Sequence, residues 1–151
     1  MEALKNTKQE QALTVSWKNR SVDFMKAYQE QDVKKMLANC SENGTVAFLP
    51  LGEDGKGKIQ EKGKAIWSAL IDSFPTIDNT INSVVTENGS VKCDVTIRGK
   101  QEKGFGGLPS RGKSFEEDHI FIFKIDDDGF IDDITINWNH SSLVSQLSYD
   151  K

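Results

Sequence analysis

The sequence is poor in the features that mark membrane, secreted and metal-binding proteins. Among 151 residues it has two cysteines, three prolines and two histidines, and no apolar run is long enough to span a membrane. Cys40 and Cys93 are too few and too far apart for a disulfide framework or a zinc site. The polar start, "MEALKNTKQEQ", cannot serve as a secretory signal. We therefore expect a cytoplasmic protein with reduced thiols and no membrane partner.

The charges are balanced and mixed along the chain. Nineteen basic and 23 acidic residues give a net charge of −4, and lysines alternate with acids in "EDGKGKIQEKGK". This pattern is typical of a solvated surface rather than of a basic stripe that follows phosphates, so we expect no nucleic-acid partner. The length fits a single domain over residues 1–151.

The order of the predicted elements is helices first and strands afterwards. Apolar residues at steps of three and four predict helices over 16–31 and 64–74, and a short helix follows the N-cap residue Asp32. Alternating or β-branched runs predict strands at 45–51, 77–85, 90–100, 119–125 and 130–139. The sequence therefore predicts an α+β domain whose helices pack on one face of a bent sheet.

Two motifs resemble ligand sites but lack a required part. The run from Gly52 to Ile59 has the glycine and lysine spacing of a phosphate-binding loop, but Ile59 replaces the hydroxyl that magnesium needs. The "DDDG" turn lies between predicted strands, which favours a hairpin over a calcium loop. His119 and His140 lack a carboxylate at a metal-binding spacing. We expect no metal.

Several motifs in a fixed order carry a resemblance. "FPTIDNTINSVVTENGSV" leaves the third helix, and "VTIRGKQEKGFGGLPSRGK" joins a strand to a glycine-rich loop; "IDDDGFI" and "SLVSQL" follow. In this order and spacing the chain resembles the SnoaL-like polyketide cyclase family, within the nuclear transport factor 2-like superfamily.

The resemblance implies an architecture and an assembly. It implies a nuclear transport factor 2-like cone, in which a curved antiparallel sheet wraps around three N-terminal helices and encloses one pocket, usually in a homodimer. The loop Gly104–Lys113 would then lie over the mouth, with Phe105 and Leu108 capping the pocket or the dimer seam; a plug at the end of the core fits them equally well.

The resemblance also implies a chemistry that this sequence does not carry in full. The family's cyclases close rings by acid–base catalysis without metal or cofactor, using a carboxylate on the last strand. That position falls on Asn139, whose amide cannot act as a general base. Asp118, Asp133 and His119 remain weak catalytic candidates, and His119, beside Phe121, also fits a core residue.

The faces of the last strand decide which residues meet the pocket. Asp133, Asn137 and Asn139 share one face, while the apolar face fits a dimer interface and consists of Ile134, Ile136 and Trp138. A β-bulge would exchange the two faces. On this assignment the residues expected to line the pocket are Trp17, Phe24, Tyr28, Trp67, Phe105, Leu108, His119, Phe121, Asn137 and Asn139.

The sequence leaves three functions open. The first is binding of a small lipophilic molecule in an apolar pocket. The second is a cofactor-independent cyclase or isomerase that acts on a polyketide-like or other carbonyl compound with a relocated acid–base group. The third is a dimerisation module without catalysis. The loss of the carboxylate at Asn139 favours binding over catalysis.

Overall fold

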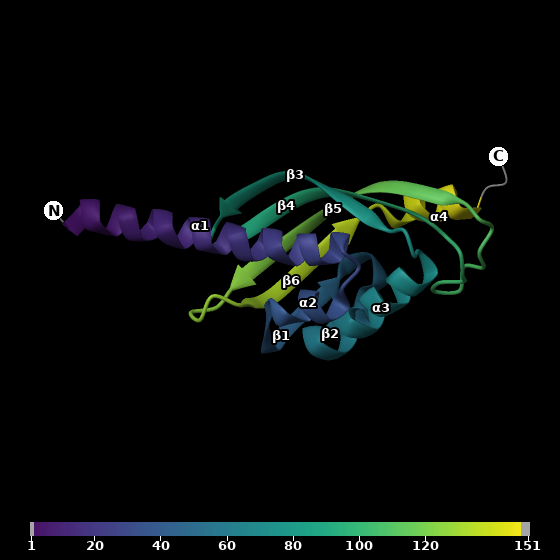
Figure 1. Cartoon of the computed structure of the whole chain (residues 1–151), viewed down its shortest axis with the longest axis horizontal. Coiled ribbons are helices and arrows are strands. Elements are labelled where there is room, and N and C mark those ends of the chain that lie inside the picture. The colour runs from purple at the N-terminus through teal and green to yellow at the C-terminus, as the bar shows by residue number, and fades with distance from the viewer. Residues whose placement is uncertain (1, 149–151) are drawn as a thin grey trace.

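Helices cover one face of a curved sheet, and a last helix lies at the far end of the chain (Figure 1). The structure, a computed structural model, describes the backbone of residues 2–148 and the side chains of residues 11–148. The three helices that precede the long strands are α1 (Glu2–Gln29), α2 (Val33–Ala38) and α3 (Lys64–Ser73). The final helix is α4 (His140–Ser148).

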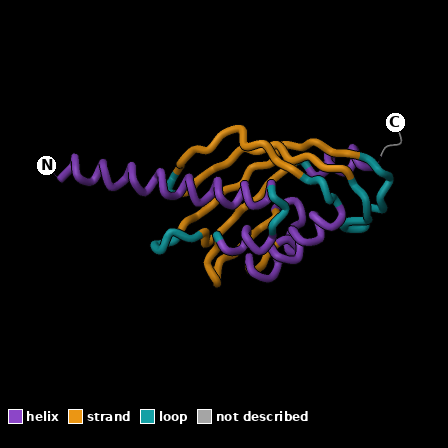
Figure 2. Tube along the Cα trace, in the orientation of Figure 1, coloured by secondary structure: helices purple, strands orange, loops and turns teal. Residues whose placement is uncertain are grey.

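The sheet, whose strands are orange in Figure 2, has six strands in the order β2-β1-β6-β5-β4-β3. The strands are β1 (Cys40–Phe48), β2 (Lys56–Lys58), β3 (Asp78–Glu87), β4 (Ser90–Lys100), β5 (Ser114–Ile125) and β6 (Ile131–Trp138). All neighbours are antiparallel except β1 and β6, which are parallel. Two short helical segments, η1 (Leu49–Gly55) and η2 (Ile59–Gly63), connect β1, β2 and α3. The predicted α+β cone is confirmed.

Aromatic side chains fasten the helices to the sheet. Phe24 of α1 contacts Trp67 of α3 at a centroid distance of 5.2 Å and Phe123 of β5 at 5.5 Å. Trp67 also meets Phe48 of β1 at 5.5 Å. Edge-to-face pairs at these distances add to the free energy gained from burying the rings.

The two cysteines are buried, and burial raises the pKa of each thiol to about 12, so both are poor nucleophiles.

The last strand turns the opposite face inward from the one that the sequence analysis expected. Ile134 and Ile136 are 0% and 1% exposed, and half-buried Trp138 lies on the same side. Asp132 is the extra residue of a bulge, because Ile131 pairs with Ile125 whereas Asp133 pairs with Lys124. The dimer face predicted at Ile134, Ile136 and Trp138 is therefore corrected: these side chains pack against the helices, where burying apolar surface is favourable.

The length and hydrophobicity of the helices bear on whether the chain could span a membrane. In the described part of the chain, no helix is both long enough and apolar enough to cross a membrane.

Candidate ligand pocket

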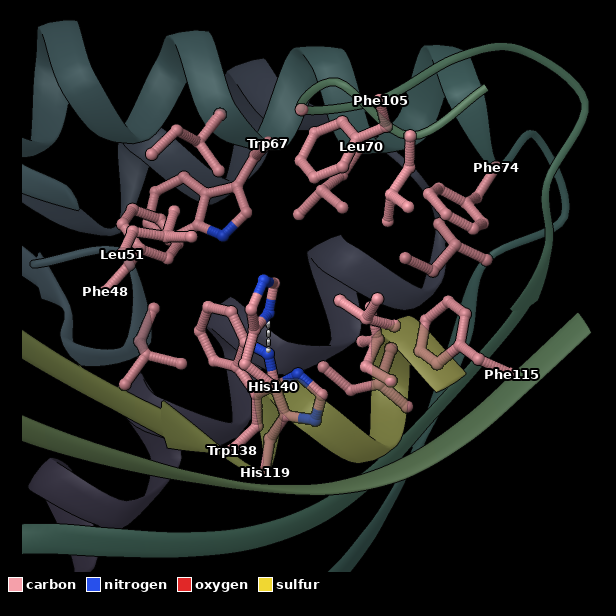
Figure 3. Close-up of a pocket in the computed structure, with 18 of the residues that line it drawn as sticks. Phe48, Leu51, Trp67, Leu70, Phe74, Phe105, Phe115, His119, Trp138 and His140 are labelled. Carbon is pink, nitrogen blue, oxygen red and sulfur yellow. Dashed lines mark hydrogen bonds between the residues drawn. The ribbon is translucent and has the colours of Figure 1, made fainter. Parts of the chain in front are cut away.

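An apolar pocket with a volume of about 210 Å³ lies between α3 and the strands β4, β5 and β6 (Figure 3). Its helical walls come from α1, α3 and α4, and its remaining walls come from the sheet, η1 and the loop after β4. Twenty residues line it: Tyr28, Phe48, Leu51, Ile66, Trp67, Leu70, Phe74, Ile77, Ile97, Phe105, Gly106, Leu108, Phe115, His119, Phe121, Ile136, Trp138, His140, Leu143 and Val144. None of these described residues carries a carboxylate, ammonium or guanidinium group.

The glycine-rich loop forms one edge of the pocket. Phe105 and Leu108 exchange two backbone hydrogen bonds of 2.9 and 2.8 Å, which closes a tight hairpin turn at the loop tip. The two intervening residues, Gly106 and Gly107, have φ values of 54° and 84°. A turn with positive φ at both central positions strongly favours glycine, which explains the paired glycines. The turn holds the Phe105 and Leu108 side chains against the pocket.

Polar contacts fix the base of the same loop. Gln101 is fully buried, and its Nε2 donates to the backbone oxygens of Lys103 and Leu108, both at 3.0 Å. Ser73, at the end of α3, donates through its hydroxyl to the Gly104 carbonyl at 3.0 Å. The loop is therefore held to α3 and to its own first residue. Gln101 acts as a brace and lies outside the pocket lining.

Two deeply buried side chains offer hydrogen bonds to the pocket. Trp67 and Tyr28 are 1% and 2% exposed, and both line the pocket. Figure 3 shows the Trp67 indole nitrogen directed into the space between α3 and the strands. Burial raises the pKa of Tyr28, so its hydroxyl stays protonated. Both groups are thus neutral donors on the helical side.

His119 is the buried titratable group of the sheet side. It is 8% exposed, and its Nδ1 lies 2.9 Å from the backbone oxygen of Glu117. Burial lowers the pKa of His119 to about 4, against smaller opposite effects of the Glu117 carbonyl and of Asp118. The imidazole is therefore neutral at physiological pH. A neutral imidazole can accept a proton or a hydrogen bond through its free nitrogen.

Trp138 and His140 complete the sheet side of the pocket. The Trp138 Nε1–H donates to Nδ1 of His140 at 3.2 Å. The Trp138 ring also lies against His119, with a centroid distance of 5.2 Å and a 19° angle between the planes. Figure 3 shows these three side chains together, opposite Trp67 and Leu70. His140 is exposed and stands at the rim.

The sequence analysis placed six pocket residues where the structure brings them together and four where it does not. Tyr28, Trp67, Phe105, Leu108, His119 and Phe121 line the pocket. Phe24 lies behind Trp67 in the core, and half-buried Trp17 packs against the core outside the lining. Asn137 is exposed on the outer face of β6. These three assignments and that of Asn139 are corrected by the direction of β6 and by the depth at which α1 packs.

Asn139 follows the last strand and begins α4. Its side-chain oxygen accepts a hydrogen bond from the Ser142 amide at 3.0 Å, and its backbone oxygen accepts one from the Leu143 amide at 3.2 Å. Asparagine is among the best residues at this N-cap position. The side chain is exposed and outside the pocket lining. A structural reason therefore accounts for the asparagine at this position.

The two candidate carboxylates face away from the pocket. Asp118 is exposed on the outer face of β5, where it accepts a hydrogen bond from the Thr96 hydroxyl at 2.8 Å. Asp133 accepts one from the Thr45 hydroxyl on the outer side of β6. Neither lines the pocket, so of the three catalytic candidates only His119 meets it. Among residues 11–148 no group of three or more His, Cys, Asp or Glu side chains could hold a metal ion.

Sequence reasoning missed Trp138 and His140 as pocket residues. The sequence pattern predicts a dimer face at Trp138 and offers His140 only as a metal ligand. The available signal was Trp138 itself, because a large apolar residue two positions from Ile136 on the same strand face belongs with the core side. No sequence pattern places the His140 ring beside the Trp138 indole, since that contact depends on how α4 begins.

The fold defines a class of protein, the nuclear transport factor 2-like α+β cone. The family model for SnoaL-like polyketide cyclases matches residues 19–147. The chain belongs to the SnoaL-like polyketide cyclase family. A comparison with curated protein sequences finds no match.

Solved structures share this fold at low sequence identity. One is described as a candidate SnoaL-like polyketide cyclase from Jannaschia sp. CCS1, with 13% identity, a TM-score of 0.81, and coverage of 92% of this chain and 96% of the other. TsrD from Streptomyces laurentii has 23% identity, a TM-score of 0.74, and coverage of 89% and 96%. A candidate polyketide cyclase from Xanthomonas campestris pv. campestris has 18% identity, a TM-score of 0.76, and coverage of 90% and 99%. At these identities the likeness shows the fold alone.

Proposed function

We propose that the pocket binds a neutral, largely apolar small molecule of one or two rings. The volume of about 210 Å³ supports this size, because a cavity of roughly 150 Å³ is sufficient for benzene. Family membership is consistent with a cyclase or isomerase type of function.

The absence of charge in the described lining is the observation that carries the proposal. A bound carboxylate or ammonium would lose its hydration without gaining an opposite charge, which costs several kcal/mol or more. The uncharged polar groups of Trp67, Tyr28, His119 and His140 would instead orient a ligand through a carbonyl or a hydroxyl. Aromatic walls such as Phe74 and Phe115 favour flat rings.

A cofactor-independent cyclase or isomerase is the second candidate. His119 favours it, because a neutral imidazole in an apolar pocket can take the place of a general base. A pure dimerisation module is less well supported, since such a role gives no reason for four uncharged polar side chains to converge on one pocket. The candidates differ in what they require: both small-molecule functions need the pocket open, whereas a dimerisation module does not.

Calorimetric titration with two matched probes tests the binding proposal. β-Naphthol is neutral and β-naphthoate carries a carboxylate on the same ring system. We expect β-naphthol to bind and β-naphthoate to bind at least about tenfold more weakly, because its charge must be desolvated. Equal affinities, or tighter binding of the anion, would contradict the proposal.

A pair of variants on α3 shows whether binding occurs in this pocket. Leu70→Trp adds bulk inside the pocket, whereas Ala69→Trp adds the same ring on the exposed side of the helix. Binding of β-naphthol should be lost in the first and retained in the second. Retention in both variants would place the ligand elsewhere, and loss in both would point to a general effect of altering α3.

A further inference from the structure

The two histidines of the pocket are held in opposite tautomers. Nδ1 of His119 lies 2.9 Å from the Glu117 backbone oxygen, which can only accept a hydrogen bond. Nδ1 of His119 therefore carries the hydrogen, and Nε2 of the neutral ring is left with a free lone pair. Among the described residues Nε2 has no hydrogen-bond donor. His119 thus presents a proton acceptor.

His140 has the reverse arrangement. Its Nδ1 lies 3.2 Å from Nε1 of Trp138, and an indole nitrogen can only donate. Nδ1 of His140 is therefore the acceptor in this contact, and the hydrogen of the ring is on Nε2. His140 thus presents a proton donor. Trp138 acts as a positioning residue, because the hydrogen bond from its indole selects the tautomer.

Trp138 also brings the two imidazoles together. Its ring centroid lies 5.2 Å from that of His119 and 5.9 Å from that of His140, and all three side chains line the same pocket (Figure 3). A proton acceptor and a proton donor therefore share one wall of an apolar cavity. The described lining contains no carboxylate that could compete for either role.

We propose that His119 and His140 form a carboxylate-free acid–base pair that exchanges a proton at the carbon next to a ligand carbonyl. This inference rests on the proposed function, because the ligand must first occupy the pocket. His119 accepts the proton at Nε2, and His140 donates a hydrogen bond from Nε2–H to the carbonyl oxygen.

The step balances without any further reactant. The C–H bond breaks, and its electron pair forms the C=C bond of an enolate as the carbonyl oxygen gains negative charge facing His140. The proton forms the second N–H bond of His119. In D2O the imidazolium exchanges its proton for a deuteron and returns the deuteron to carbon, so the ketone is regenerated with one deuterium and the protein is unchanged.

The surroundings of His119 are compatible with the acceptor role over a broad pH range. The residues paired with it across β4 and β6 are Val95 and Trp138, which do not titrate here. The Glu117 carbonyl and the charge of Asp118, both on its own strand, raise the pKa of His119 against the larger effect of burial. With a pKa of about 4 the ring stays unprotonated at neutral pH. Enolisation by a base with a pKa of about 4.6 is established for ketosteroid isomerase.

The test uses β-tetralone, a neutral bicyclic ketone with an acidic methylene between its ring and its carbonyl. Binding is measured by calorimetry, and deuterium uptake at that methylene in D2O is followed by proton NMR with and without the full-length protein. We expect uptake above the buffer rate at neutral pH, where the His119 imidazole is unprotonated. Uptake catalysed by hydroxide alone would be the same with and without the protein.

Substitutions at His119 test whether its imidazole acts as the base or only supports the structure of the pocket. His119→Gln places an amide near the Nε2 position, and His119→Asn keeps a donor for the Glu117 carbonyl; neither amide is a base. Both should bind β-tetralone within about threefold of the parent and lose at least about tenfold in uptake. Trp138→Phe keeps the stacking on His119 but removes the indole donor, and should lower uptake with little change in binding. Asp118→Asn and Asp133→Asn, on the outer face, should leave uptake unchanged.

The outcomes distinguish this inference from the proposal on which it rests. If β-tetralone binds but uptake equals the buffer rate, or survives in both His119 variants, the acid–base pair is wrong and the binding function stands. Loss of uptake in Asp118→Asn or Asp133→Asn would also overturn it, in favour of a carboxylate. If β-tetralone does not bind at all, the proposed function fails and the inference fails with it.

Discussion

The Trp138 indole lies nearly parallel to the His119 imidazole, with ring centroids 5.2 Å apart and planes 19° apart. The two residues are directly paired across β5 and β6. The indole therefore shields one face of the imidazole from water, which contributes to the low exposure of His119, 8%, and to its lowered pKa. The same contact therefore packs β5 against β6 and helps to lower the pKa of a residue that lines the pocket.

His119 should make folding sensitive to acid. Its pKa is about 4 in the folded protein, whereas an ordinary solvated histidine, as in the unfolded chain, has a pKa of 6.5. Between these values the unfolded state binds the proton and the folded state does not, so stability is full above pH 6.5 and falls as the pH drops to 4. The loss from this residue amounts to about 3 kcal/mol.

The measurement is urea unfolding of the parent and His119→Gln across this pH range. Glutamine does not titrate, so the unfolding free energy of the parent should fall by about 3 kcal/mol relative to that of the variant as the pH drops from 6.5 to 4. Other acid-sensitive groups affect both proteins equally and cancel. A difference that stays constant with pH would show that His119 has an ordinary pKa.

The buried amide of Gln101 should be essential to the loop. Gln101→Glu keeps the size but removes the N–H donors for the Lys103 and Leu108 carbonyls, and it places a charge where the side chain is fully buried. We expect a loss of about 2–4 kcal/mol in the free energy of unfolding. Glu102→Gln, at the exposed neighbouring position, is the matched control and should have little effect. Equal stability of both variants would contradict the bracing role.

The predictable part of this protein follows from periodic apolar residues. The sequence predicts a strand over 90–100, and β4 spans Ser90–Lys100 because alternate residues from Val91 to Ile97 are buried. The third helix was expected over 64–74 and ends at Ser73. α1 begins at Glu2 rather than near residue 16, since its first half has helix-forming residues but no apolar face to reveal it.

The pocket was only partly predictable. An alternating pattern shows which residues share a face of a strand, but it does not show which face points toward the core. The alternation correctly places Ile134, Ile136 and Trp138 on one face of the strand. The expected dimer led us to turn that face outward, whereas burial of its apolar surface turns it inward. Asn139 was read as a position in the pocket, whereas the strand ends at Trp138 and the chain turns into α4. The tautomers depend on two local hydrogen bonds, Glu117 with His119 and Trp138 with His140, whose geometry no periodicity encodes.

The paired glycines of the loop tip should tolerate alanine poorly. Gly106 and Gly107 have positive φ, and a Cβ added to either would meet no atom within 4 Å, so the cost is conformational rather than steric. Each change to alanine should lower the unfolding free energy by about 1 kcal/mol. Gly104 has no positive φ, and its added Cβ would lie 3.4 Å from the Leu108 oxygen. Gly104→Ala should therefore be neutral or slightly stabilising. Denaturant unfolding of the three variants measures the contrast, and equal effects would refute the turn assignment.

The homodimer expected from the resemblance should use the outer face of the sheet. Ile120 and Ile122 of β5 point away from the pocket and remain partly exposed in the single chain. Ile122 is paired with Lys92 of β4 and Thr135 of β6. These polar neighbours do not bury its apolar surface, which a second chain would cover. We predict that the parent sediments as a dimer and that Ile122→Glu sediments as a monomer, because the interface would bury an unpaired carboxylate. Trp138→Phe, on the inner face, should remain dimeric. A dimer that survives Ile122→Glu would place the interface elsewhere, and a monomeric parent would refute the dimer itself.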